Sequence, residues 1–334
     1  MTDSIAQSGR AWWTLPGPDG GVLDDREAPV PSPTPGYVLI RVRAAGVNRG
    51  ELIGRPRQRL DNPASRPSAS GNEFAGVVAA LGDGVSGWAV GDRVIGRGVG
   101  CHADYTLIHA RALWPIPEPL SFPEAAALPN VVVTAHDAIV THGRVTSGDA
   151  VLITAGSSGV GTAAIQIARW LEASPILATT RSPQKAAALM ELGATDVIDT
   201  TQSEWPDIVR ERSGEGVQAV IDQVGGALFP GLLQSMALRG RYVSVGRNGG
   251  SGANIDLDLV ALKRLHLMGV TFRTRSLEET LVCSERCAAD LLEAIRQGAL
   301  RPVLDRVFPL EALPEAHTYM LTNQQIGKIV LSMD

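Results

Sequence analysis

The chain has 334 residues, of which 44% are hydrophobic and 19% are charged, and its formal net charge is −5. This length is enough for two domains that each bury a core, and the composition is typical of a soluble globular protein. The mildly acidic balance argues against nucleic acid or an anionic membrane surface as the main partner. Three cysteines are too few for a disulfide framework. No signal peptide or long apolar run is present, so we expect a cytoplasmic protein.

The first part of the chain combines short apolar runs with glycine turns and shows little helical pattern. Strands are expected near residues 11–15, 37–43, 71–82, 91–96 and 103–108. This pattern predicts a small, mostly antiparallel β barrel or sandwich.

The pattern changes near Ser121, which forms a possible capping box with Glu124. A second helical stretch is expected at 131–142, and strands then alternate with helices. The expected strands are 151–154, 176–180, 197–199, 219–221, 242–245 and 267–271, and the expected helices are 160–171, 183–192, 206–212, 228–236 and 257–265. Alternation of this kind predicts an α/β fold with a doubly wound parallel sheet of the Rossmann type.

The end of the chain departs from this alternation. A long amphipathic helix is expected at 277–297, followed by strands at 303–308 and 328–333. These two strands have no partner in the parallel sheet, so we expect them to return to the first domain.

A glycine-rich turn between the strand at 151–154 and the next helix predicts a dinucleotide site. The residues expected to bind the cofactor are Gly156, Ser157, Ser158, Gly159, Val160 and Gly161. Gly156 permits the tight turn, Gly161 allows the helix to pack closely on the strand, and N–H groups at the helix start face the pyrophosphate. Ser158 stands where the G-x-G-x-x-G pattern has its middle glycine, so a plain tight strand–helix connection is the alternative interpretation.

The end of the second strand favours NADP(H) over NAD(H). An acidic residue binds the NAD ribose at this place, whereas this strand ends with Thr180 and Arg181. Arg181 offers donors suited to a 2′-phosphate, and Lys185 follows one turn into the next helix. We therefore predict NADP(H), with Thr180, Arg181 and Lys185 among its contacts. The alternative for Arg181 is an ordinary surface arginine.

Several motifs occur in order along nearly the whole chain. They are Gly46-Val47-Asn48, Gly71-Asn72-Glu73-Phe74-Ala75-Gly76, Gly91-Asp92-Arg93-Val94, the glycine turn ending at Gly161, Gly193-Ala194, Val245-Gly246 and Gly327-Lys328. Together they resemble the medium-chain dehydrogenase/reductase superfamily, in its zinc-free quinone oxidoreductase branch of the ζ-crystallin type. The resemblance implies a GroES-like catalytic domain over 1–122 and 272–334 and a Rossmann NADP(H)-binding domain over 123–271. It also implies a cleft at their junction and often a homodimer.

The zinc-dependent branch of the superfamily is the nearest rival. At the positions that match its metal ligands this chain has Asn48, Asn72 and roughly Asn130. Zinc prefers cysteine, histidine and carboxylate ligands, and asparagine amides replace them poorly. We therefore expect no metal site.

The resemblance implies hydride transfer from NADPH to a quinone or an α,β-unsaturated carbonyl, whose own carbonyl accepts the electrons. Asn48 is the catalytic candidate, as a hydrogen-bond donor to the developing enolate; a residue that ends a turn is the alternative. By position, the further cofactor contacts are Thr134, Val224, Gly246, Arg247, Phe272 and Lys328, with a helix-interior threonine as the alternative for Thr134. The proton donor and the physiological substrate stay open. A non-catalytic, crystallin-like NADPH-binding protein and a zinc alcohol dehydrogenase are the alternative functions.

Overall fold

The computed structural model describes residues 5–54, 58–118 and 120–333. Its contacts divide the chain into two compact units. Unit 1 contains residues 1–130 and 302–334, and unit 2 contains residues 131–301. The long helix α9 (Leu277–Arg296) lies within unit 2, where Asp290 Oδ2 accepts a hydrogen bond from His136 Nε2 at 2.7 Å. The sequence predicts domain boundaries at 122/123 and 271/272. The two units divide at 130/131 and 301/302, which is eight and thirty residues later.

Unit 1 is built from two β-sheets. Its strands are β1 (Ser8–Leu15), β2 (Val22–Pro29), β3 (Tyr37–Val47), β4 (Ser68–Ala69), β5 (Glu73–Leu81), β6 (Arg93–Arg97), β7 (Tyr105–His109), β8 (Leu113–Pro115), β15 (Leu304–Pro309) and β16 (Lys328–Ser332). The larger sheet has the order β15-β16-β3-β5-β6-β8, with β7 also paired to β3, and the smaller has the order β2-β1-β4. All these pairs are antiparallel except that of β15 with β16.

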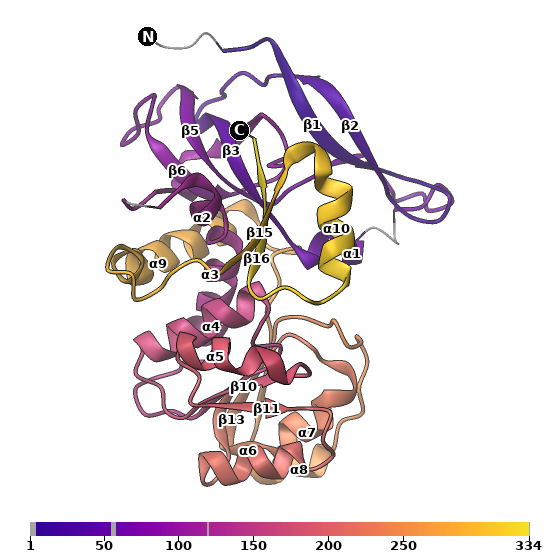
Figure 1. Cartoon of the computed structure of the whole chain (residues 1–334), viewed down its shortest axis with the longest axis vertical. Coiled ribbons are helices and arrows are strands. Elements are labelled where there is room, and N and C mark those ends of the chain that lie inside the picture. The colour runs from indigo at the N-terminus through magenta and orange to yellow at the C-terminus, as the bar shows by residue number, and fades with distance from the viewer. Residues whose placement is uncertain (1–4, 55–57, 119, 334) are drawn as a thin grey trace. The chain divides into compact units, whose positions relative to one another are not determined.

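Strand β3 is the centre of unit 1 because its apolar residues are buried along most of its length. It pairs with β5 on one side and with β16, from the far end of the chain, on the other. Helix α10 (Leu313–Leu321) lies beside α1 (Arg49–Gly54), where Leu313 and Met320 share an apolar cluster with Leu52 (Figure 1). The final two strands thus belong to the sheet of unit 1, as the sequence predicts.

Helix α2 (Phe122–Ala126) begins at the predicted capping box. The Glu124 N–H donates to Ser121 Oγ, and the Glu124 carboxylate accepts from the Ser121 N–H. Helix α3 (Pro129–His136) follows and continues as a π-helical segment, Asp137–His142, so the helix expected at 131–142 is confirmed with a change in hydrogen-bond pattern.

Unit 2 contains a six-stranded, fully parallel sheet. Its strands are β9 (Val151–Ile153), β10 (Ile176–Thr180), β11 (Asp196–Asp199), β12 (Val217–Asp222), β13 (Met236–Ser244) and β14 (His266–Gly269). Their spatial order is β11-β10-β9-β12-β13-β14. Two halves that meet at β9 and β12 are the arrangement of a Rossmann fold, which confirms the predicted fold class.

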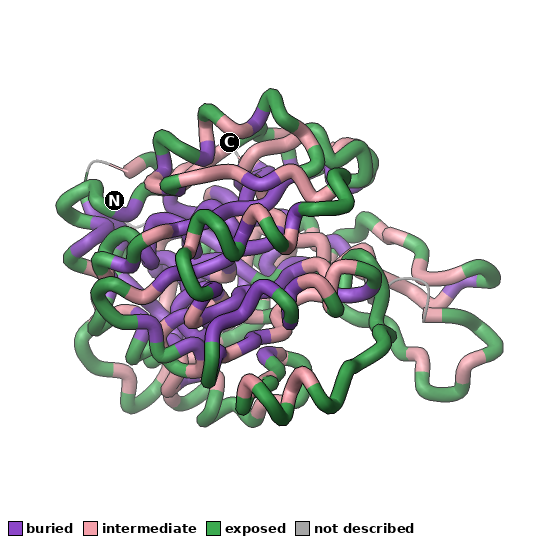
Figure 2. Tube along the Cα trace, turned by 90° about the horizontal axis from the view of Figure 1, so that it is seen from below, coloured by how far each residue is buried: buried purple, intermediate pink, exposed green. Residues whose placement is uncertain are grey.

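Helices cover this sheet in two groups. The helices are α4 (Gly159–Trp170), α5 (Ala186–Leu192), α6 (Trp205–Ser213), α7 (Phe229–Gln234) and α8 (Leu257–Lys263). Helix α4 packs with α5, whereas α6, α7 and α8 pack together (Figure 1). Strands β9, β10 and β12 are buried over nearly their whole length, whereas β14 is largely exposed. Figure 2 shows the buried residues enclosed by exposed segments of the chain.

The main difference from the expected elements in unit 2 lies at the start of β13. A helix was expected to reach residue 236, but α7 ends at Gln234 and Met236 already pairs with Val217 of β12. Met236 is fully buried among the core residues of unit 2, so tertiary packing decides its conformation. Across the described residues, none of the helices combines the length and the apolar character that crossing a membrane requires.

Candidate functional site

The turn after β9 holds its backbone in a fixed conformation. Ala155 has a positive φ of 48°, and the Gly156 N–H donates to Thr179 O at 2.9 Å. Ser158 is the N-cap of α4, where its Oγ accepts from the Gly161 N–H at 3.0 Å and donates to Gln223 Oε1 at 2.6 Å. The serine at the place of the middle glycine therefore caps the helix and ties its start to the end of β12.

Gly161 leaves no room for a side chain. A Cβ atom there would lie 2.4 Å from Ala155 O and 2.7 Å from Gly156 O. The start of α4 therefore packs directly on the turn, and the first N–H groups of a helix have no intrahelical acceptors. Ser157, Gly159 and Val160 are half-buried at this helix start. A turn of this form fits the pyrophosphate of a dinucleotide, because backbone donors and the helix dipole favour an anion there.

The residues expected at the 2′-phosphate follow β10. Thr180 is buried at the end of the strand and its Oγ1 accepts from the Ser182 N–H at 3.0 Å. The Arg181 side chain is exposed. Lys185 is buried in the short 3-10 turn that follows. Arg181 is therefore the cation of this group that a phosphate can reach without a rearrangement of the chain.

Asp222 organises the carboxyl end of β12. Its carboxylate accepts from Thr154 Oγ1 at 2.7 Å, from the N–H groups of Val224 and Gly225 at 2.9 Å, and from Tyr242 Oη at 2.6 Å. Burial and the negative charge of Asp222 raise the pKa of Tyr242 well above its ordinary value, so this phenol stays protonated.

The next turn is packed against the same strand end. The Gly246 N–H donates to Asp222 O at 3.1 Å, and a Cβ at Gly246 would lie 2.4 Å from Gln223 O. The structure thus brings Val224 and Gly246, both expected to contact the cofactor, to one rigid edge of the sheet.

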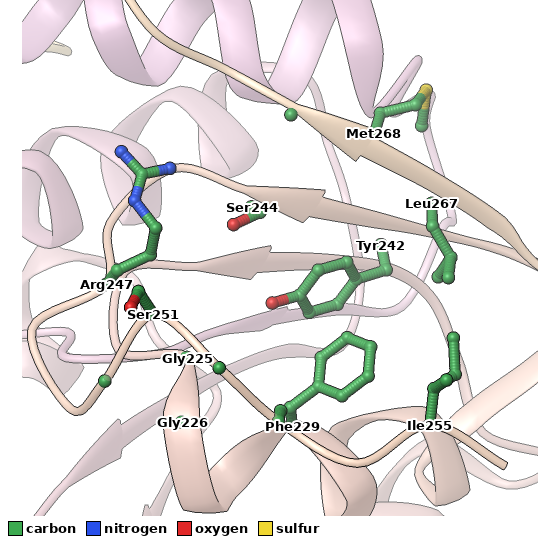
Figure 3. Close-up of a pocket in the computed structure, with 14 residues that line it drawn as sticks. Gly225, Gly226, Phe229, Tyr242, Ser244, Arg247, Ser251, Ile255, Leu267 and Met268 are labelled. Atoms are coloured by element: carbon green, nitrogen blue, oxygen red, sulfur yellow. The ribbon is translucent and has the colours of Figure 1, made fainter.

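A pocket of about 430 Å³ lies beside this edge, within unit 2. In its middle the Tyr242 and Phe229 rings lie next to each other, with centroids 5.0 Å apart (Figure 3). Leu267 and Ile255 lie at one end and Arg247 at the other (Figure 3). Of the residues expected to bind the cofactor, Arg247 alone lines this pocket.

Thr134 and Phe272 lie in other parts of unit 2. Thr134 is half-buried in α3. The guanidinium carbon of Arg275 lies 4.5 Å from the centroid of the Phe272 ring, and Arg275 Nη2 lies 2.6 Å from the buried Asp137 carboxylate. The Asp137–Arg275 ion pair therefore supports the segment that carries Phe272.

A buried polar cluster in unit 1 surrounds Asn48. Lys328 Nζ donates to Val47 O and Asn48 Oδ1 at 2.8 Å and to Glu73 Oε1 at 2.7 Å. Asn48 Nδ2 donates to Glu73 Oε1 at 2.8 Å, and Asn130 Nδ2 donates to Asn48 Oδ1 at 2.9 Å. These contacts bring together two predicted site residues, Asn48 and Lys328, that are 280 positions apart.

A second set of ionisable residues lies next to this cluster. His102 and His317 approach Glu51 Oε2 at 4.0 and 3.4 Å. Burial raises the pKa of Glu51, but its interactions with His102, His317 and Lys328, which include a hydrogen bond from His317, outweigh the effect of burial, and the net pKa lies below the ordinary value. Glu51 is therefore a carboxylate at neutral pH.

Among the residues that hold their neighbours in place, Glu73 and Asp222 had no role assigned from the sequence, and Asn130 was noted only as the match to a metal ligand. Glu73 and Asp222 are both fully buried carboxylates, each at the end of an apolar strand. An acidic residue at the end of an apolar strand was the available sequence signal for such a role. A charge is buried in a protein only where ion-pair or hydrogen-bond partners compensate it. The role of Asn130 depends on chain-distant contacts and left no local signal.

The donor set of the polar cluster suits hydrogen bonding better than metal binding. Lys328 is an ammonium within bonding distance of Asn48 and Glu73, and a cation at that place repels a metal ion. Among residues 5–54, 58–118 and 120–333, no group of three or more histidine, cysteine or acidic side chains could hold a metal.

Comparisons with known proteins follow the division into two units. Residues 34–118 match the alcohol dehydrogenase GroES-like domain, and residues 159–286 match the family model described as zinc-binding dehydrogenase. The mouse quinone oxidoreductase-like protein 2 is 31% identical over 301 residues, which cover 90% of this chain and 85% of that protein. The chain belongs to the medium-chain dehydrogenase/reductase superfamily.

Two further members show the same relationship. Rat quinone oxidoreductase is 31% identical over 306 residues, which cover 90% of this chain and 91% of the rat protein. A mycobacterial member, Rv1454c, solved in complex with NADPH, superposes with a TM-score of 0.86 at 29% identity, over 97% of this chain and 99% of that one. Unit 1 of this superfamily member is therefore its GroES-like domain and unit 2 its Rossmann domain, and the chain is an oxidoreductase of the quinone oxidoreductase-like kind.

Proposed function

We propose that the protein is a zinc-independent, NADPH-dependent reductase of quinones or α,β-unsaturated carbonyls. The observation that carries the proposal is the polar cluster of unit 1, in which Asn48 offers a hydrogen-bond donor beside the Lys328–Glu73 ion pair. Hydrogen-bond donors without metal ligands suit a substrate whose oxygen gains negative charge during the reaction and is stabilised by hydrogen bonding alone.

The residues of unit 2 fit the cofactor by their chemistry. The Gly156–Gly161 turn leaves backbone donors at the start of α4 and excludes a side chain at Gly161. Arg181 is exposed at the end of β10, where the guanidinium suits a 2′-phosphate and no carboxylate follows the strand directly. The likeness to a relative solved with NADPH supports the same choice.

When bound, NADPH supplies the hydride that reduces the substrate carbon. Asn48 donates a hydrogen bond to the substrate oxygen, which gains negative charge as the carbon is reduced. Glu73 and Lys328 hold the Asn48 amide and compensate each other's charge. The buried Asp222 keeps the adjacent turns at Val224 and Gly246 in place. We assign the final proton to solvent.

The test is a steady-state assay of NADPH oxidation with a panel of quinones and enones, with and without a metal chelator. We expect the rate of NADPH oxidation to be unchanged by the chelator, and the rate with NADH to be lower. NADPH binding without turnover on any substrate would favour a non-catalytic NADPH-binding protein. Loss of activity on chelation, restored by zinc, would favour a metal-dependent dehydrogenase.

We also propose that the protein forms a homodimer through the β14 side of unit 2. Strand β14 ends the order of the six-stranded sheet. Leu257, Leu262 and Leu267, in α8 and β14, are 70%, 70% and 39% exposed. An open sheet edge with exposed leucines is a typical association surface. Light scattering of the wild type and of Leu267→Lys tests this; a monomeric wild type would contradict it.

A further inference from the structure

The amide of Asn48 is held by ionised groups at both of its ends. Its Oδ1 accepts from Lys328 Nζ at 2.8 Å, whereas its Nδ2 donates to Glu73 Oε1 at 2.8 Å. An ammonium has only donors and an ionised carboxylate has only acceptors. A rotated amide would place its NH₂ against the ammonium and its oxygen against the carboxylate. The two charged partners therefore fix which end of the amide is oxygen.

Asn130 also supports this orientation of the Asn48 amide. Arg97 Nε donates to Asn130 Oδ1 at 3.1 Å, and a guanidinium also has only donors. The Asn130 amide is thereby turned so that its Nδ2 donates to Asn48 Oδ1 at 2.9 Å. The Asn130 N–H adds a bond to Glu73 Oε2 at 2.7 Å, which holds the carboxylate in place.

These contacts leave Asn48 with only a hydrogen-bond donor for any further partner. Two hydrogen bonds use both lone pairs of its Oδ1, and Glu73 takes one of its two Nδ2 hydrogens. The other hydrogen has only contacts of 3.5 Å, to Gly46 O and Glu51 Oε1, which is longer than a normal hydrogen bond. Asn48 is half-buried, and this second N–H makes the weakest contacts of the amide.

We propose that Lys328 and Asn130 are positioning residues that make Asn48 an obligate hydrogen-bond donor, so that it binds the substrate through an acceptor such as a carbonyl oxygen. The inference rests on the proposed function and adds the residues that orient its hydrogen-bond donor. All three donors of the Lys328 ammonium are used inside unit 1, which supports this role over the cofactor contact expected from the resemblance.

The test uses two positioning variants with a matched control for each. Lys328→Met removes the ammonium, and Asn130→Asp keeps an acceptor for Arg97 but turns an oxygen toward Asn48 Oδ1. Lys263→Met is the control for the first, because Lys263 Nζ also donates to backbone carbonyls, those of Gln234 and Met236. Asn323→Asp is the control for the second, because Asn323 Oδ1 also accepts from an arginine, Arg49.

Two measurements are made on each protein. Selective ¹⁵N-asparagine labelling gives the side-chain amide resonances, and that of Asn48 is identified by its loss in Asn48→Asp. Steady-state kinetics with an enone give kcat and the KM for NADPH. We expect both positioning variants to shift the Asn48 resonance and to lower kcat about a hundredfold, as a displaced catalytic group does. The KM for NADPH and the controls should not change.

The inference is overturned if the Asn48 resonance is the same in both positioning variants as in the wild type, or if it shifts while kcat stays unchanged. If Lys328→Met does not fold, Asn130→Asp decides alone. If the wild type reduces no quinone or enone, the proposed function fails, and the amide spectra still decide whether Lys328 and Asn130 orient Asn48.

Discussion

Lys328 Nζ lies 2.7 Å from Glu73 Oε1, and the two side chains are 4% and 0% exposed. The pair joins the start of β16 to the start of β5, which lies 255 positions earlier in the chain. Each charge is costly to bury without the other. The stability of unit 1 and its proposed chemistry therefore both depend on Lys328 and Glu73.

Lys328→Met should lower the free energy of unfolding by about 3–5 kcal/mol, because it leaves the Glu73 carboxylate buried without its cation. The double variant Glu73→Gln/Lys328→Met should recover much of that loss, since no charge is then left unpaired. Urea denaturation of the three proteins measures both effects. A double variant less stable than Lys328→Met would show that the pairing of charges is not what matters.

Arg181→Ala should weaken NADPH binding about 10- to 100-fold and leave NADH binding nearly unchanged, because a hydrogen bond to a charged group contributes about 1.5–3 kcal/mol. Calorimetric titration with each cofactor measures the two affinities. Arg212→Ala is the control, since Arg212 is an exposed arginine of the same unit that pairs with Asp196. Equal losses for NADPH and NADH would rule out a 2′-phosphate contact for Arg181.

Gly161→Ala should destabilise unit 2 by about 1–3 kcal/mol, as overpacking does, and weaken cofactor binding. Its Cβ would lie 2.4 Å from Ala155 O, so the helix start must move away from the turn. Gly252→Ala is the matched control, because a Cβ there meets no atom within 4 Å. Thermal unfolding and cofactor titration of both variants check this. A Gly161→Ala protein that binds NADPH as the wild type does would contradict the role of this turn.

Stability should fall as the pH is lowered below about 6.5, the ordinary pKa of histidine. Burial lowers the pKa of His102 and outweighs the attraction of Glu51, so His102 stays neutral in the fold while the unfolded chain takes up a proton. The unfolded state then binds more protons, and each such group contributes up to about 1.4 kcal/mol per pH unit.

The measurement is urea denaturation between pH 5 and 8. His102 Nε2 lies 3.2 Å from Gly46 O, to which it can only donate, and Nδ1 lies 3.0 Å from Ser70 Oγ, which can donate to a neutral ring. His102→Gln should flatten the pH dependence, whereas His266→Gln, at an exposed histidine, should keep it. A steep slope that survives His102→Gln would assign it to another group.

Local patterns predicted several elements of both units closely. In unit 2 the apolar run at 176–180 is β10 with the same bounds, and in unit 1 the capping box at Ser121 and Glu124 is formed. Met236 shows the limit of such patterns, because its strand conformation follows from burial in the core and not from its neighbours in sequence.

The candidate site was predictable only in part. The glycine turn and Arg181 are local features, so they can be identified from the sequence alone. The contacts of Asn48 with Glu73, Asn130 and Lys328 join four separate segments of the chain, so no spacing along the chain indicates them. The oriented amide could be inferred only once those donors and acceptors were placed in space.

The most direct test of the central claim follows the transferred hydrogen. NADPH deuterated at C4 of the nicotinamide is incubated with the protein and an enone in water, and the product is analysed by mass spectrometry and NMR. We expect one deuterium on the carbon β to the carbonyl and none at the α carbon, where the proton comes from solvent. A product without deuterium at the β carbon from either C4-deuterated epimer of NADPH, or no product at all across the substrate panel, would contradict it.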